Sequence, residues 1–115
     1  MYPVIEMARA RNFYESVLKL APGSITADGA WVEYDLPKGG CFAITTLAEG
    51  VKPSANAGGS IAFEVEDLDE LITTLKSKKV EVKLDIFSSP VCRMAVILDS
   101  EGNSIVLHQL NQPKR

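Results

Sequence analysis

The sequence lacks the features that direct a protein to a membrane or to a nucleic acid. No apolar run approaches the ~20 residues that a membrane-spanning helix needs, and no basic start precedes an apolar leader. The net charge is only −3, with both signs dispersed along the chain, which argues against a nucleic-acid partner. We therefore expect a protein that works in the cytoplasm, without a membrane or a nucleic acid as partner.

Metal-binding residue types are also scarce. The chain has one histidine, His108, and two cysteines, Cys41 and Cys92, whose spacing matches no common metal motif. We expect reduced thiols that pack as small hydrophobic side chains. The only basic cluster, at residues 76–79, falls at the end of an expected helix, where cations complement the helix dipole.

The strongest positive signal is an internal repeat. A short apolar segment with an acidic end, followed by an amphipathic helix, occurs around Glu6 and again around Asp67. The turns at Gly40 and Gly102 match as well, so the repeat period is about 60 residues. A chain of 115 residues is one domain by size, and the repeat predicts two copies of one supersecondary unit.

Each half is expected to hold one strand, one helix and three further strands. In the first half we expect strands at residues 2–5, 24–27, 31–36 and 41–47. The apolar face of the first helix follows the i, i+3, i+4 pattern and consists of Ala10, Phe13, Tyr14, Val17 and Leu18. In the second half we expect strands at residues 60–65, 80–87, 91–98 and 104–110. Its helix begins at Asp67, which forms a capping-box-like pair with Glu70.

This order of elements indicates an α+β fold of two βαβββ modules in a single domain, 1–115. Module one spans residues 1–47 and module two spans 60–110. The linker at 48–59 is rich in proline, glycine, serine, asparagine and alanine. Each helix is expected to cover one face of a small mixed sheet. The opposite faces of the two sheets, open and curved, would then enclose a central cavity.

Three of these motifs resemble the vicinal oxygen chelate superfamily, which contains glyoxalase I, bleomycin-resistance proteins and extradiol dioxygenases. The run at residues 10–18 is similar to its A-x-x-F-Y-x-x-V-L helix, and residues 61–69 are similar to the opening of its second module. Residues 99–105 resemble its D-P-x-G-N-x-I turn, with Ser100 where proline is usual. The resemblance covers essentially the whole chain and implies βαβββ modules forming an open, U-shaped sheet around a ligand cavity.

The resemblance also implies where a metal would bind. Enzymes of this superfamily hold one divalent metal with two ligands from each module, and the metal polarises vicinal oxygens or activates dioxygen. Carried over to this sequence, three ligand positions fall on Ile44, Ser60 and Val106, and the fourth falls before Met1. Isoleucine and valine have no ligand atom and serine is a poor neutral ligand. We therefore expect no metal site of the family type and no cofactor.

The single histidine is one candidate for chemistry in the cavity. Strand alternation places His108 on the same face as Ser104 and Val106. One interpretation is a group that hydrogen-bonds a ligand or transfers a proton. The other is a structural histidine that contacts a backbone carbonyl or lies exposed near the end of its strand.

Charged side chains allow two interpretations as well. Glu64 shares the face of Ser60, and it either recognises a cationic or hydroxylated ligand or is a structural charge. It would then face water or pair with Arg93 or another cation. Arg93 itself either clamps a carboxylate or phosphate of a ligand or is a strand-end charge paired on the surface. Trp31 and Phe42 either line the cavity or pack in the core.

Two functions from different classes are consistent with these residues. The first is a binder of a small, largely apolar molecule, with a cavity that is often shared across a homodimer in similar proteins. The second is a glyoxalase-like lyase or isomerase, or a dioxygenase-related enzyme, with a non-standard site at which His108, Glu64 and Ser60 converge. We also expect a homodimer, because a short first strand leaves an open sheet edge. The expected ligand-binding residues are Trp31, Phe42, Ile44, Ser60, Glu64, Arg93, Val106 and His108.

Overall fold

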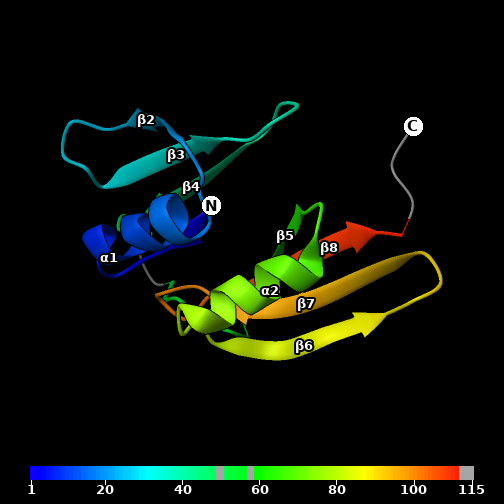
Figure 1. Ribbon diagram of the computed structural model, residues 1–115. Coiled ribbons are helices and arrows are strands. Elements are labelled where there is room, and N and C mark those ends of the chain that lie inside the picture. The colour runs from blue at the N-terminus through cyan, green and yellow to red at the C-terminus, as the bar shows by residue number, and fades with distance from the viewer. Residues whose placement is uncertain (49–50, 57–58, 112–115) are drawn as a thin grey trace. The chain divides into compact units, whose positions relative to one another are not determined.

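The chain forms two compact units, Met1–Ser54 (unit 1) and Ala55–Arg115 (unit 2) (Figure 1). The structure, a computed structural model, describes residues 1–48, 51–56 and 59–111. Each unit contains one mixed four-stranded sheet in the order strand, helix and three strands. This confirms the α+β class and the two βαβββ modules that the repeat predicts. No helix in the described residues has both the length and the apolar character needed to cross a membrane.

Unit 1 follows its sequence pattern closely. Its elements are β1 (Tyr2–Pro3), α1 (Met7–Asn12), η1 (Phe13–Val17), β2 (Pro22–Ile25), β3 (Trp31–Asp35) and β4 (Cys41–Thr45). The strand order is β1-β4-β3-β2, with β1 parallel to β4 and the other pairs antiparallel. Strand β2 begins at Pro22 rather than at residue 24. Proline fits there because β2 is an edge strand and needs fewer backbone donors.

Aromatic rings from the helical segment and the sheet form the core of unit 1. Tyr14 is fully buried, and its ring centroid lies 5.0 Å from that of Phe42 and 6.0 Å from that of Tyr34. Phe13 contacts Tyr14 edge-on at 5.2 Å. The helix continues as a π-turn over η1, a geometry that the apolar spacing of the sequence does not reveal.

A charged network borders this core. Glu15 accepts hydrogen bonds from Arg11 Nε at 2.7 Å and from the Tyr34 hydroxyl at 2.9 Å. The hydrogen bond from Arg11 is the main reason that the pKa of Glu15 lies below its ordinary value, although partial burial opposes the shift. Burial, followed by the hydrogen bond to Glu15, raises the pKa of Tyr34 well above its ordinary value.

We expect Glu15→Gln to change the acid sensitivity of the fold. Because the carboxyl pKa is lower in the folded chain than in the unfolded chain, its contribution is complete above the unfolded value of about 4.3 and is lost as the pH falls through the folded value. The variant should be about 1–2 kcal/mol less stable than the wild type near neutral pH. Urea unfolding at neutral pH and at about pH 3 measures this gap. An equal gap at both pH values would contradict this account of Glu15.

Unit 2 repeats the order of unit 1 with longer strands. Its elements are β5 (Ile61–Glu64), α2 (Leu68–Ser77), β6 (Val82–Ser88), β7 (Cys92–Leu98) and β8 (Ser104–Leu110). The strand order is β5-β8-β7-β6, with β5 parallel to β8. The side chain of Asp67 accepts the Glu70 N–H at 3.1 Å, so the expected N-terminal cap of α2 is confirmed. Apolar side chains of the helix and the sheet form the core: Leu68, Ile72, Leu75, Ala95, Ile97, Ile105 and Leu107.

The turn between β7 and β8 explains the D-S-E-G-N motif. The side chain of Asp99 is almost fully buried, and its Oδ1 accepts the N–H groups of Glu101 and Asn103, each at 2.8 Å. Gly102 has a φ of +91°, which favours glycine. The motif therefore fixes the register with which β8 enters the sheet.

Candidate functional site

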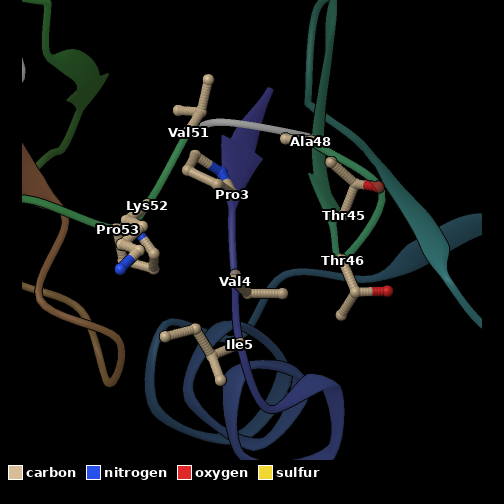
Figure 2. A pocket seen from close by; sticks show the side chains of 9 residues that line it. All are labelled: Pro3, Val4, Ile5, Thr45, Thr46, Ala48, Val51, Lys52 and Pro53. Carbon is tan, nitrogen blue, oxygen red and sulfur yellow. The ribbon is translucent and has the colours of Figure 1, made fainter.

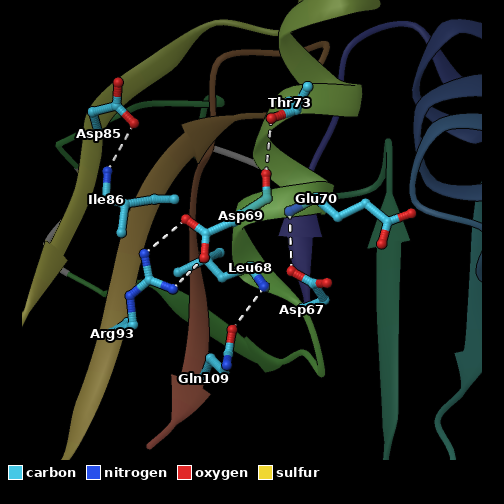
Figure 3. A network of polar contacts seen from close by, with 9 residues as sticks. All are labelled: Asp67, Leu68, Asp69, Glu70, Thr73, Asp85, Ile86, Arg93 and Gln109. Carbon is cyan, nitrogen blue, oxygen red and sulfur yellow. Dashed lines mark hydrogen bonds and ion pairs between the residues drawn. The ribbon is translucent and has the colours of Figure 1, made fainter.

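One face of the unit 2 sheet packs against α2, and three polar contacts identify that side; Figure 3 shows those of Gln109 and Arg93. Gln109 Oε1 accepts the Leu68 N–H at 2.7 Å, and Lys76 of the helix forms an ion pair with Asp85 of β6 at 2.7 Å. The guanidinium of Arg93 forms a two-point ion pair with Asp69. Side chains at the alternate positions of these strands therefore lie on the opposite face, called the open face of unit 2 from here on.

The open face of unit 2 carries two rows of side chains, each with one member from every strand. The register pairs define the first row as Glu64, His108, Met94 and Phe87. They define the second row as Ala62, Val106, Val96 and Leu84. Register partners share a face and lie within contact distance of one another. Across these two rows, the face is thus polar at the Glu64–His108 end and apolar elsewhere.

These apolar side chains are only partly buried within the described structure. Met94, Val96 and Val106 are half-buried, while Leu84 and Phe87 remain 50% and 40% exposed. Phe87 reaches this face because the register of β6 shifts between Leu84 and Phe87. Such a bulge breaks the simple alternation and re-aims the following side chain.

The polar end of the first row is a histidine–carboxylate pair. His108 Nδ1 lies 2.5 Å from Glu64 Oε1, and Glu64 Oε2 accepts the Leu110 N–H at 3.0 Å. Parallel pairing of β5 with β8 places the two side chains opposite each other. His108 is 27% exposed and Glu64 is 55% exposed. Glu64 therefore pairs with His108 and not with Arg93, and more than half of its side chain still faces water.

Arg93 is not on the open face. Its ion pair with Asp69 lies on the helix side, and its hydrogen bond lowers the pKa of Asp69 below the ordinary value. These contacts match the interpretation of a strand-end charge paired on the surface. Arg93 pairs in register with Gln109 and shares its side of the sheet, so Arg93 does not lie on the face that carries His108.

Phe42 and Ile44 are also on a helix side, that of unit 1. Ile44 pairs in register with Val32, Phe42 pairs with Tyr34, and all four side chains are buried. The prediction that Ile44 and Phe42 line a cavity is therefore wrong. A shift of one residue along the strand moves a side chain to the opposite face. The contact of Phe42 with Tyr14 matches the other interpretation of Phe42, which is packing in the core.

The remaining predicted residues lie at accessible positions. Trp31 faces away from the helical segment of unit 1, and its Nε1 donates to Glu33 at 3.0 Å. Ser60 is exposed and directly precedes β5. Unit 2 thus brings Glu64, Val106 and His108 together on one face. Their neighbours Met94, Val96, Leu84 and Phe87 were not among the predicted site residues. The continuous apolar run at 94–98 was a signal that this part of β7 is apolar on both faces.

Unit 1 contains a separate pocket of about 290 Å³ beside β1 (Figure 2). It is lined by Pro3, Val4, Ile5, Thr45, Thr46, Ala48, Val51, Lys52 and Pro53. The lining is mostly apolar, and Ile5 is 71% exposed at its edge. Among the described residues that line the pocket, Lys52 is the only charged one, and these residues contain no acid–base pair. The pocket therefore has less capacity for chemistry than the open face of unit 2.

Comparison with known proteins agrees with this architecture. The profile of the Glyoxalase/Bleomycin resistance protein/Dioxygenase superfamily matches residues 1–107. The chain belongs to this superfamily. No curated protein matches it by sequence.

Solved structures share the fold of this superfamily member at low sequence identity. An antibiotic-binding protein from Streptomyces sp. CB03234 is 22% identical, with a TM-score of 0.79 over 96% of this chain and 91% of its own. A putative glyoxalase family protein from Bacillus anthracis is 17% identical, with a TM-score of 0.79 over 96% and 90%. A lactoylglutathione lyase from Agrobacterium tumefaciens is 19% identical, with a TM-score of 0.73 over 93% and 87%.

The residues of this chain do not fit the divalent metal that many members of the superfamily hold. Ile44 is buried in the core of unit 1, and Val106 offers no donor atom on the open face of unit 2. Across residues 1–48, 51–56 and 59–111, no three His, Cys, Asp or Glu side chains gather into a possible metal site. Glu64 and His108 contribute only two donors, and these contact each other.

Proposed function

We propose that this protein binds a small, largely apolar molecule on the open face of unit 2, without the divalent metal of the superfamily. The observation that supports this most is the second row of that face, Ala62–Val106–Val96–Leu84, with Met94 and Phe87 beside it. These side chains are partly exposed within the described structure, so a ligand can remove apolar area from water. Each 100 Å² removed contributes about 2.5 kcal/mol before the costs of association.

The chemistry of the face favours a flat ligand. Phe87 offers an aromatic ring, and Met94 has a flexible, polarisable thioether that adapts to the shape of a bound molecule. His108 and Glu64 supply the few polar groups that orient a ligand in a mostly apolar site. The Streptomyces protein of the same fold is an antibiotic-binding protein, which supports binding as the function of this scaffold.

The proposal includes the setting in which the protein works. We place it in the cytoplasm, where the free thiols of Cys41 and Cys92 stay reduced. We also propose a homodimer, because β1 is a two-residue edge strand of the unit 1 sheet, and edge strands are common sites of pairing with another chain. Size-exclusion chromatography with light scattering tests the dimer directly.

A thermal-melt panel tests the binding function. Saturating ligand should raise the melting temperature, because a molecule that binds only the folded state stabilises it by about 2.7 kcal/mol at 100 times its Kd. The panel contains planar aromatic compounds with and without hydroxyl groups, each measured with EDTA present. The proposal predicts stabilisation by the planar aromatic compounds in EDTA. A panel in which no compound raises the melting temperature would refute it.

The histidine–carboxylate pair supports a second candidate function, a metal-independent lyase or isomerase. A carboxylate that orients Nδ1 leaves Nε2 available as a general base for a proton next to a carbonyl. A test of this function is to incubate the protein with a panel of α-hydroxy ketones in deuterated water. NMR then follows the exchange of the protons next to the carbonyl for deuterium. His108→Ala should remove the exchange. Identical exchange in the variant and the wild type would exclude His108 as the base.

A further inference from the structure

The His108–Glu64 pair gives the open face of unit 2 a hydrogen-bonding group with a defined direction. Glu64 Oε1 lies 2.5 Å from His108 Nδ1, and the other carboxylate oxygen accepts the Leu110 N–H at 3.0 Å. An ionised carboxylate has no proton to donate, so Nδ1 is the donor in this pair. The neutral imidazole then carries its lone pair on Nε2, and Nε2 is an acceptor.

The acceptor is adjacent to the apolar part of the face. Met94 is the register partner of His108 on β7, and Val106 is two positions away on the same strand and the same face. Within residues 1–48, 51–56 and 59–111, no second hydrogen bond reaches the His108 side chain. A ligand on the apolar rows therefore has one ring-nitrogen acceptor at its edge.

We propose that His108 Nε2 accepts a hydrogen bond from a hydroxyl group of the ligand, and that the preferred ligands are neutral phenols and stable enols with a planar apolar body. This inference rests on the proposed binding function and specifies its ligand class. A planar ring covers Met94 and Val96, while its hydroxyl group reaches the imidazole. Acceptor-only ligands would place a lone pair against Nε2. Anionic ligands would face the exposed carboxylate of Glu64.

The variant Glu64→Gln tests whether Glu64 sets the tautomer of His108, because the Leu110 N–H determines which way the new amide group is oriented. In the variant, the amide oxygen is the only acceptor of the side chain, and the Leu110 N–H is positioned to donate to it. The amide NH₂ group then faces Nδ1 and donates to it. The proton of the neutral ring must move to Nε2, so the acceptor becomes a donor.

NMR of the His108 imidazole nitrogens detects this change of tautomer in the absence of a ligand. On ¹⁵N-histidine-labelled full-length protein at alkaline pH, the wild type should show a protonated Nδ1 and an unprotonated Nε2. Glu64→Gln should show the reverse. The same tautomer in both proteins, or a protonated Nε2 in the wild type, would overturn the inference. Because no ligand is present, this result does not depend on the proposed function.

Matched probes then test the ligand class. 2-Naphthol has a hydroxyl donor, and 2-methoxynaphthalene has the same ring system with an acceptor only. Fluorescence titration of the wild type should give a Kd for 2-naphthol about three- to tenfold below that for 2-methoxynaphthalene, the range expected for one net hydrogen bond. Glu64→Gln should lower or reverse this preference. His108→Phe should abolish the preference while both probes still bind.

The controls separate the two proposals. Phe87→Ala should weaken both probes by a similar factor, because it removes apolar contact and leaves the His108–Glu64 pair intact. Binding of both probes to the wild type with equal affinity would overturn the ligand class and leave the binding function standing. Failure of both probes to bind would refute the binding site on this face, and with it the ligand class, whatever tautomer the NMR shows.

Discussion

Val96→Asp should abolish binding of an apolar ligand while leaving the protein folded. Val96 lies near the centre of the open face of unit 2, between Val106 on β8 and Leu84 on β6. A bound ligand would cover the new carboxylate and leave it without water or a cationic partner. An uncompensated buried charge costs about 3–5 kcal/mol, so the Kd should rise at least about 100-fold. Isothermal titration calorimetry with 2-naphthol measures this change.

The matched control is Val91→Asp. Val91 is 68% exposed, precedes β7 and is one residue out of phase with the face-lining positions of that strand. The same change of charge and size there should leave the Kd within about twofold of the wild type and the melting temperature nearly unchanged. Equal loss of affinity in both variants would show that net charge, rather than the open face of unit 2, controls binding.

Tyr14→Ala should produce the largest loss of stability in the protein. The ring of Tyr14 is fully buried and contacts three other aromatic rings, those of Phe13, Tyr34 and Phe42. Truncating a buried aromatic side chain costs about 3–5 kcal/mol through lost burial and the cavity that remains. That is a large share of the ~5–15 kcal/mol by which domains are stable. Urea unfolding followed by circular dichroism measures the change.

Ile25→Ala serves as the control for this truncation. Ile25 is 46% exposed on the edge strand β2, so its truncation removes an apolar side chain without opening a buried cavity. Its cost should stay below about 1 kcal/mol. If the two variants unfolded at the same urea concentration, the aromatic cluster would not be the main support of unit 1.

Local signals made most of the fold predictable. The cap at Asp67 and the turn at Asp99 depend on a few neighbouring residues, and both appear where the sequence places them. The apolar face of the first helix also holds, since Ala10, Phe13 and Tyr14 are buried. The period of about 60 residues then implied two copies of one unit, and the βαβββ order of both units follows it.

The face of the sheet on which a side chain lies was harder to predict than the order of the strands and helices. Residues 41–44 are apolar at every position, so alternation does not tell which side chains face the helix. The pairing of Ile44 with the buried Val32 shows that Ile44 faces the helix. This pairing joins two different strands, so local alternation does not reveal it. The face of Arg93 was not predictable for the same reason, because the other residues of β7 are apolar on both faces. The shift in β6 that brings Phe87 to the open face leaves no clear sequence signal either.

The candidate site was partly visible in the sequence. Alternation along β8 correctly put His108 and Val106 on one face, and parallel pairing with β5 places Glu64 opposite His108. The second hydrogen bond of Glu64, from the Leu110 N–H, depends on the exact geometry at the end of two strands. The hydrogen bond from the Leu110 N–H orients the Glu64 carboxylate toward His108 Nδ1. In the proposed arrangement, this orientation makes His108 Nε2 the hydrogen-bond acceptor.

The most direct test of the account is a methyl NMR titration of the full-length protein with 2-naphthol in the presence of EDTA. Binding on the open face of unit 2 without a metal predicts saturable shifts of the Met94, Val96 and Val106 methyl signals, with the Val32 and Ile44 signals unchanged in the core of unit 1. An absence of shifts at the three face-lining residues, or shifts that appear only after a divalent metal replaces EDTA, would contradict it.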